Sequence, residues 1–242
     1  MGQLDGKVAV DTGDSSCIVL EIATRFVREG ARVFLTGRRE AELARAAAAL
    51  GGSVIAVPGD VTREADLARL HTAVEEAGSP VDILVANAGG GRPAGLADLT
   101  RDGFDLTTDL NFKATYFTVQ RVLPLFEDGG SIVLLGSAAG SAGSTRFGVY
   151  AATKAAVRSM ARSMALELAG RGIRVNTLSP GPIATPSLAM APAEVIEEAT
   201  ARVPLGRAGR PEEVAAALFL ASPESSYITG IELFVDGGAR QV

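Results

Sequence analysis

Short apolar runs alternate with amphipathic helical stretches along almost the whole chain. This alternation is typical of βα units built around a parallel sheet, and it argues against a β-sandwich or a helical bundle. Because the crossovers in such units are right-handed, they predict an α/β fold with a Rossmann-type, doubly wound parallel sheet and helices on both faces. The predicted strands are Lys7–Asp11, Arg32–Thr36, Ser53–Val57, Val81–Ala86, Ser131–Ser137, Ile173–Leu178 and Glu232–Val235.

Length and composition predict a single domain over residues 1–242. The chain is 47% hydrophobic, which is enough for one large core. The segment from Pro180 to Arg210 breaks the rhythm of strands and helices, because it is rich in Pro, Gly, Ala and Thr before Pro211 opens another helix. We expect a substrate loop or lid around residues 182–210, and disorder without ligand is equally compatible with its composition. The glycines expected to end helices are Gly30, Gly51 and Gly170.

The charge pattern indicates a small-molecule partner. The formal net charge is −5 and the basic residues are scattered along the chain, which argues against nucleic acid or an anionic membrane as a partner. Cys17 is the single cysteine, so an internal disulfide framework is excluded. The sequence shows neither a cationic leader followed by an apolar stretch nor a long apolar span, and we expect a cytoplasmic protein.

Tyr150 and Lys154 are four residues apart in a predicted helix, so their side chains lie on the same face. A free tyrosine has a pKa of about 10, and a fixed cation nearby favours the phenolate, which suits a general acid or base. Taken alone, the pair is better explained as an ordinary helix-surface contact, because such pairs arise often by chance. The setting favours chemistry, because Ser137 ends a predicted buried strand at the sheet edge where open α/β sheets bind ligands.

Several motifs are specific when they are taken together. They are Asn87-Ala-Gly89 after the fourth strand, Asn111 on the next helix, Ser137, Tyr150 with Lys154, Pro180-Gly181 after the sixth strand and Asp236-Gly-Gly238 after the last. Tyr150 comes 13 residues after Ser137. On these motifs the chain resembles the short-chain dehydrogenase/reductase family across essentially its full length, and within it the 3-oxoacyl-ACP reductases and ketoreductases. The resemblance implies an oxidoreductase that forms a homotetramer.

The resemblance also implies catalytic roles. Tyr150 would protonate the carbonyl oxygen during reduction, while Ser137 hydrogen-bonds the same oxygen. Lys154 would lower the Tyr150 pKa and hold the nicotinamide ribose, and Asn111 would support a water that leads protons from Lys154 toward solvent. These groups suit hydride addition, because the alkoxide that forms needs a proton donor and a hydrogen-bond donor aimed at it. The alternative for Asn111 is a polar cap or a helix-bending residue.

The same resemblance implies a nicotinamide cofactor. Asp60 would accept from the adenine amino group and Val61 would pack on the base; Thr62 is the better N-cap of the next helix, which leaves Asp60 for a ligand. The run Thr36-Gly-Arg-Arg39 has no carboxylate for ribose hydroxyls. Arg38 is placed to bind a 2′-phosphate, which favours NADP(H) over NAD(H), and a surface arginine is the alternative. The expected cofactor contacts are Gly13, Ser15, Ile18, Arg38, Asp60, Val61, Asn87, Ala88, Gly89, Tyr150, Lys154, Pro180, Gly181 and Ile183.

The first turn departs from the family pattern. The family pattern is Thr-Gly-x-x-x-Gly-x-Gly, whereas this chain has Thr12-Gly-Asp-Ser-Ser-Cys-Ile-Val19. Cys17 and Val19 place side chains where the missing glycines would let the backbone approach the pyrophosphate and the helix pack on the strand. Asp14 adds a negative charge at a helix N-terminus that should attract phosphate.

Asp11 ends an otherwise apolar predicted strand. A buried carboxylate is costly without partners, so we expect Asp11 either to reach backbone donors or solvent near the strand end or to destabilise the domain. Asp11, Asp14 and Cys17 together suggest a cation site only weakly, because they are mixed ligands on a flexible turn, and no metal is expected.

Three interpretations of the altered turn follow. The protein is an enzyme that holds its cofactor less tightly, a dehydrogenase-like scaffold that has lost the cofactor, or an enzyme with a halide pocket in its place, as in the related halohydrin dehalogenases. Lys154 disfavours the halide-pocket interpretation, because the halohydrin dehalogenases have an arginine beside their serine and tyrosine, where this chain has a lysine. The expected substrate is a medium-sized ketone or secondary alcohol. The apolar tail 226–242 is expected at a subunit interface, or else covered within its own subunit as an edge strand.

Overall fold

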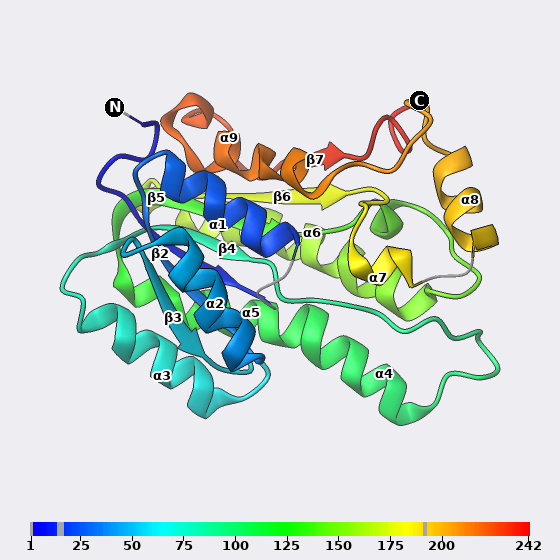
Figure 1. Ribbon diagram of the computed structural model, residues 1–242, viewed down its shortest axis with the longest axis horizontal. Coiled ribbons are helices and arrows are strands. Elements are labelled where there is room, and N and C mark those ends of the chain that lie inside the picture. The colour runs from blue at the N-terminus through cyan, green and yellow to red at the C-terminus, as the bar shows by residue number, and fades with distance from the viewer. Residues whose placement is uncertain (1, 14–16, 191–192) are drawn as a thin grey trace.

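The computed structural model describes residues 2–13, 17–190 and 193–242. Within them the chain forms a seven-stranded sheet, in which all neighbouring strands are parallel, in the order β3-β2-β1-β4-β5-β6-β7 (Figure 1). The order reverses between β1 and β4, which confirms the predicted doubly wound α/β fold. The strands are β1 (Val8–Thr12), β2 (Arg32–Gly37), β3 (Val54–Pro58), β4 (Val81–Ala86), β5 (Phe126–Leu135), β6 (Arg174–Pro180) and β7 (Glu232–Val235).

Each predicted strand is present, and β5 differs most from its predicted bounds. It begins at Phe126 and ends at Leu135, so the prediction that Ser137 ends this strand is wrong. Ser137 lies beyond the strand because its Oγ accepts a hydrogen bond from the Ala139 backbone N–H at 3.2 Å and caps a 3-10 turn, Ala138–Ser141. The serine is therefore held by a turn and not by the sheet.

Helices cover both faces of the sheet, and each face has its own apolar core (Figure 1). On one face pack α1 (Ile18–Arg28), α2 (Glu40–Leu50) and α9 (Ala217–Ala221), and on the other α3 (Glu64–Glu75), α5 (Ala114–Val122) and α6 (Gly148–Leu168). Strand residues alternate between these cores, so Val8 and Val10 face the second while Ala9 faces the first.

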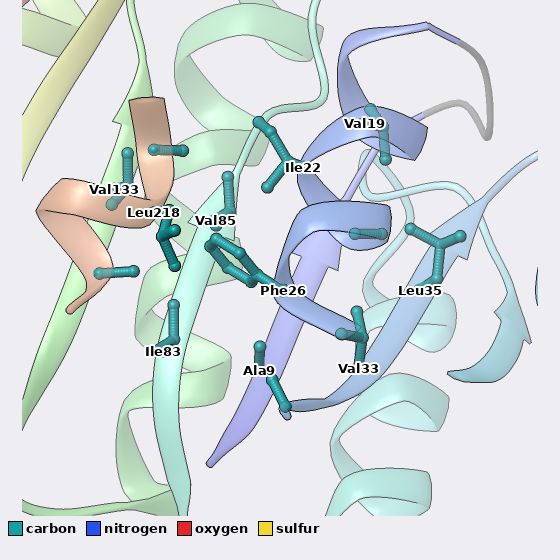
Figure 2. Packing of buried hydrophobic residues seen from close by; sticks show 14 of the residues in the cluster. Ala9, Val19, Ile22, Phe26, Val33, Leu35, Ile83, Val85, Val133 and Leu218 are labelled. Carbon is teal, nitrogen blue, oxygen red and sulfur yellow. The ribbon is translucent and has the colours of Figure 1, made fainter. Parts of the chain in front are cut away.

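Phe26 fixes α1 on the sheet. Figure 2 shows its ring lying over Ile83 and Val85 of β4, with Leu218 of α9 beside it. The Phe26 side chain is fully buried, and burying a phenylalanine contributes about 1.5–3 kcal/mol. Because Phe26 lies near the C-terminal end of α1, this contact holds the helix in place independently of the turn that precedes the helix.

The predicted helix ends are confirmed for α1 and α2. Helix α1 ends at Arg28, shortly before Gly30, and Gly51 directly follows α2. The prediction for α6 is wrong, because a 3-10 turn extends the helix beyond Leu168. The residue in left-handed conformation is consequently Gly172 (φ 67°) and not Gly170.

The segment predicted as a loop around residues 182–210 contains two short helices, α7 (Pro186–Ala189) and α8 (Ala193–Ala201). It lies beyond the carboxyl end of β6 (Figure 1). Its two ends meet, because Ile183 forms a parallel β-bridge with Gly209. A 3-10 helix, Pro211–Ala216, follows and continues into α9. Among the described residues, none of the helices is long and apolar enough to cross a membrane.

Candidate active site

A cavity of about 380 Å³ lies at the carboxyl ends of β1, β2, β3 and β4, where the strand order reverses. This is the position at which open α/β sheets bind ligands. The predicted cofactor residues that line it are Gly13, Ile18, Arg38, Asp60, Val61, Asn87, Ala88 and Gly89. The structure thus brings together residues that are spread over more than seventy positions of the sequence.

Other predicted cofactor residues do not line this cavity. Pro180 ends β6, and the Gly181 N–H donates to the Val235 carbonyl at 3.0 Å. A Cβ at position 181 would lie 2.7 Å from the Cβ of Asp236. Only glycine fits here, because the residue that follows β7 approaches the backbone closely. Ile183 is buried and pairs with Gly209. Ser15 and Asp14 lie outside the described residues.

The cavity wall also includes residues that were not among the predicted cofactor contacts, although two of them belong to the predicted loop 182–210, namely Thr36, Gly37, Arg39, Gly59, Leu110, Thr185 and Pro186. Thr185 is informative, because it comes from the segment beyond β6 and its Oγ1 accepts from the Leu188 N–H at 3.3 Å to cap α7. Threonine followed by proline is a helix-start signal, so this contact could have been found from the sequence. Arg39 is paired with Glu42 at 2.6 Å.

Asn87 and Gly89 form the floor of the cavity at the end of β4. The Asn87 Nδ2 is buried and makes no hydrogen bond within the described part of the chain. A Cβ at Gly89 would lie 2.7 Å from the Asn111 Oδ1 and 2.9 Å from the Lys154 Nζ, so only glycine fits there. The bare backbone at Gly89 and the orphaned amide at Asn87 both suit a polar ligand.

Asp60 matches only part of the prediction that its carboxylate is left for a ligand while Thr62 caps the next helix. Helix α3 begins at Glu64 with Arg63 as its N-cap, so the prediction that Thr62 is the N-cap is wrong. The Asp60 Oδ1 instead accepts from the Thr62 N–H at 2.9 Å and the Thr62 Oγ1 at 2.7 Å. This local turn competes with helix capping, and one oxygen of Asp60 is therefore already engaged.

The altered turn brings Cys17 and Val19 to the wall of the cavity. Cys17 has φ 55° and ψ −110°, and it is the only non-glycine residue with positive φ in the described ranges. A side chain in this conformation is strained, by an amount on the order of 1–3 kcal/mol. The Val19 Cγ2 lies 2.9 Å from where a Cβ on Gly13 would be. The chain thus retains a backbone shape suited to glycine at a position that carries cysteine.

Asp11 is fully buried on the α1 side of the sheet, between Leu35 of β2 and Val85 of β4. Neither of its carboxylate oxygens has a hydrogen-bond partner among the described residues. Desolvation raises the Asp11 pKa well above its ordinary value, and the nearby Thr12 backbone N–H, which is not aligned for a full hydrogen bond, lowers it only partly. The expectation that Asp11 reaches backbone donors or solvent is wrong, because the strand continues through Thr12.

Tyr150, in the first turn of α6, lies close enough to the Ser137 side chain for that hydroxyl to lower the Tyr150 pKa. Burial raises the Tyr150 pKa above its ordinary value, and the Ser137 hydroxyl offsets only part of this rise. The predicted lowering of the Tyr150 pKa is therefore wrong for this structure, because loss of water around the phenolate dominates. The ring is enclosed by Phe147, whose centroid lies 6.2 Å away, and by the backbone of Gly91.

Lys154 is buried beneath Tyr150, with its Nζ 5.8 Å from the centroid of the Tyr150 ring. The ammonium donates to the Leu135 carbonyl at 2.7 Å, at the end of β5. Desolvation lowers the pKa of Lys154 to about 8. At pH 7 this lysine keeps most of its charge, and it loses that charge in the range just above.

Asn111 lies on a π-helical turn, Asp109–Lys113, between α4 (Arg101–Thr108) and α5. Its Nδ2 donates to the Gly90 carbonyl at 2.6 Å and to the Thr107 carbonyl at 2.9 Å, and its Oδ1 accepts from the Gly90 N–H at 3.0 Å. These bonds tie the distorted helix to the end of β4. They support the helix-bending alternative, and they also place the amide beside the loop residue Gly89, which lies next to Lys154.

The fold and the cavity, with a phenol, a hydroxyl and an ammonium grouped beside it, define a Rossmann-type dehydrogenase or reductase. Residues 13–240 match the family model described as enoyl-(acyl carrier protein) reductase. A variant of a Serratia marcescens short-chain dehydrogenase/reductase has a similar structure, with a TM-score of 0.93 and 33% identity over 98% of this chain and 99% of that one. The chain belongs to the short-chain dehydrogenase/reductase family of NAD(P)-dependent oxidoreductases.

Two curated relatives show the range of functions named for similar chains. Oxidoreductase asL5 from Sarocladium schorii is 46% identical over 99% of this chain and 98% of its own length. The 3-oxoacyl-[acyl-carrier-protein] reductase FabG from Thermotoga maritima is 38% identical over 98% of both chains. Both matches cover the altered turn as well as the Tyr150 helix.

Proposed function

We propose that this chain transfers a hydride between NADP(H) and a ketone or secondary alcohol, with Tyr150 as general acid and base. One observation carries the proposal: the Ser137 side chain lies beside the Tyr150 phenol, and the buried Lys154 ammonium is 5.8 Å from the centroid of the phenol ring. A proton donor and a hydrogen-bond donor held at one point are what a developing alkoxide needs.

The proton chemistry follows from the pKa directions. Burial keeps the Tyr150 phenol protonated at neutral pH, so it can deliver a proton to a substrate oxygen that takes on negative charge. The Ser137 hydroxyl would donate a hydrogen bond to the same oxygen. Lys154, with a pKa of about 8, remains mostly charged at pH 7 and stabilises the phenolate that is left behind. Asn111 would support a water molecule beside Lys154, through which protons pass toward solvent.

The cavity wall fits a nicotinamide dinucleotide, which would supply or accept the hydride when bound. The unpaired Asn87 amide and the bare backbone of Gly89 offer a polar cradle without a side chain in the way. Asp60 and Val61 would hold the adenine, and Lys154 the nicotinamide ribose. The contacts proposed for the rest of the cofactor are Gly13, Ser15, Ile18, Ala88, Pro180, Gly181 and Ile183.

Arg38 supports NADP(H) as the preferred cofactor. It lines the cavity beyond the end of β2, and the Arg38-Arg39 turn contains no carboxylate. A carboxylate there would hydrogen-bond ribose hydroxyls and repel a 2′-phosphate, whereas a guanidinium binds phosphate through paired N–H donors.

The segment 182–210 is proposed to cover the substrate, within a single domain that spans the chain. Thr185 and Pro186 of this segment line the cavity, and the Ile183–Gly209 bridge closes its base. A segment that is joined at its base and reaches the cofactor cavity is suited to act as a substrate wall. A medium-sized ketone or secondary alcohol is the proposed substrate class.

A scaffold with weakened cofactor binding is the second candidate function. The strained φ of Cys17 favours it, because the side chain stands where a phosphate-binding turn needs glycine. The two candidates differ in affinity for NADPH and in turnover.

A homotetramer is the proposed assembly. Aromatic side chains are exposed along α4, the π turn and α5, and they are Phe104, Phe112, Tyr116 and Phe117, each 40–47% exposed. Exposed aromatic side chains that follow one another along neighbouring elements are suited to an interaction surface, and a subunit contact is the use proposed for them. Light scattering that shows a monomer at micromolar concentration would contradict the assembly.

The function is tested by titrating the purified protein with NADPH and NADH, using calorimetry, and by assaying reduction of a panel of β-keto esters and aryl ketones. We expect NADPH binding, ketone-dependent oxidation of NADPH, and weaker binding of NADH. An Arg38→Glu variant should lose the preference for NADPH, while Arg162→Glu, an exposed change on α6, should retain it. Absence of both binding and turnover would favour the scaffold.

A further inference from the structure

We propose that Arg158 is a positioning residue, which holds the turn that aims Ser137 at Tyr150. Arg158 is on α6, one turn beyond Lys154 and two turns beyond Tyr150, so the three side chains follow one face of the helix. The proposal rests on the roles given above to Ser137 and Tyr150, and it adds a residue that neither the motifs nor the cavity identifies.

Arg158 is bonded directly to the turn that follows Ser137. Its Nη1 donates to the Ser141 Oγ at 2.7 Å, and Ser141 is the last residue of that 3-10 turn. At the other end of the turn, the carbonyl of its first residue, Ala138, accepts a hydrogen bond from the Arg240 Nε at 3.0 Å. Two arginines, from α6 and from the C-terminal segment, thus hold both ends of the turn that Ser137 caps.

The same Arg158 nitrogen anchors the turn to the sheet. It donates to the Glu232 Oε2 of β7 at 3.2 Å, and the Glu232 Oε1 accepts from the Ser179 Oγ of β6 at 2.7 Å. Ser179 is fully buried, and its Oγ occupies the space that a side chain at Gly136 would need. Gly136 is the residue before Ser137, so this chain of contacts reaches both flanks of the serine.

The network is partly shielded from solvent, since the side chains of Arg158 and Glu232 are 33% and 12% exposed. The turn also packs directly on α6, because a Cβ at Gly140 would lie 3.0 Å from the backbone of Lys154. A change at Arg158 would release the far end of the turn while Lys154 and its bond to Leu135 stay in place. The displacement would therefore fall on Ser137.

The test uses carbon-13 NMR of protein labelled at the tyrosine Cζ, because the chain has three tyrosines and Tyr150→Phe assigns the Tyr150 signal. Ser137→Ala gives the shift that follows from losing the Ser137 hydroxyl beside the phenol. We expect Arg158→Met and Ser141→Ala to move the Tyr150 signal in that same direction, and Arg158→Lys, which reaches one acceptor only, to move it less. Arg162→Met, an exposed change one turn further along α6, serves as the matched control and should leave the signal unmoved.

A second readout separates positioning from general loss of stability. Arg158→Met should lower kcat by about 10-fold to 100-fold, as expected for a misplaced group, while the Kd for NADPH stays nearly unchanged. An unmoved Tyr150 signal in folded Arg158→Met or Ser141→Ala protein would overturn the proposal, as would equal shifts for Arg158→Met and Arg162→Met. The NMR readout does not need turnover, so a failure of the proposed function, seen as full activity in Tyr150→Phe, is recognised separately.

Discussion

At the Tyr150 end of the site, Ser137 accepts from the Ala139 N–H, Lys154 donates to the Leu135 carbonyl, and the Tyr150 ring lies beside both side chains. At the turn after β1, Cys17 has a backbone conformation suited to glycine, and Asp11 is buried with no partner among the described residues. The two regions lie at the same edge of the sheet. The Tyr150 end has the side chains that the proposed chemistry needs, whereas the turn after β1 has a strained backbone. The difference shows that the departure from the family pattern is local.

The contrast also explains why the fold tolerates the altered turn. Phe26 and Ile22 of α1 are fully buried in the core on that face of the sheet. Their burial holds α1 against the sheet independently of which residues form the turn before it. We therefore expect changes at the Tyr150 end to affect chemistry, and changes at the turn to affect cofactor binding and stability.

The largest expected effect is that of Tyr150→Phe. Removing the proton donor should lower kcat by about 10²-fold to 10⁴-fold. The Kd for NADPH should stay nearly unchanged, because the cavity for the dinucleotide does not include this ring. Steady-state kinetics and calorimetry measure the two quantities. Tyr227→Phe, a change at a fully exposed tyrosine, is the control, and near wild-type kcat in Tyr150→Phe would break the assignment of chemistry to this end.

Asp11→Val should stabilise the protein by about 1–3 kcal/mol at neutral pH, because it removes a buried polar group without partners. The Asp11 pKa is raised in the folded state, so the folded protein retains a proton that the unfolded chain loses above about pH 4. Wild-type stability should therefore fall as pH rises from about 4, and the gain from Asp11→Val should grow.

Asp11→Asn separates charge from polarity in the same denaturation series. It resembles the protonated acid, so it should match wild-type stability near pH 4 and exceed it at pH 8. A gain that does not depend on pH would show that the Asp11 carboxylate finds a partner when it ionises.

The smallest effect is expected for Cys17→Gly. Glycine relieves the strain at φ 55°, but it also adds freedom to the unfolded chain, and the net gain should be about 1 kcal/mol. Cys17→Ala keeps the Cβ and should gain nothing. Chemical denaturation at one pH checks both variants, and equal stability of all three proteins would remove the evidence for strain at this turn.

Much of the architecture could be predicted because it depends on periodicity. Alternating apolar runs located all seven strands, and the ends of β1 to β4 gathered Gly13, Arg38, Asp60 and Asn87 at one cavity. The strand pattern cannot show where a polar side chain finds its partner. Asp60 bonds to Thr62 and Ser137 caps a turn, and both results come from local competition for backbone donors.

The pKa of Tyr150 could not be predicted from its spacing to Lys154. The i to i+4 relation places the two side chains on one face, but burial decides the sign of the Tyr150 pKa shift. Burial depends on Phe147 and on the loop after β4 that contains Gly91. Arg158 was missed for the same reason, because its partners Ser141 and Glu232 are far apart in sequence.

The central claim is that the turn weakens a cofactor site that is otherwise complete. It is tested by measuring the Kd for NADPH, by calorimetry, of the wild type and of a variant with glycine at Asp14, Cys17 and Val19. Removing one negative charge and two side chains from the pyrophosphate region should tighten binding by about 10-fold to 100-fold, at about 1.4 kcal/mol for each factor of ten. Equal dissociation constants in the two folded proteins would contradict the claim, since they would mean that the present turn holds the pyrophosphate as well as glycines do.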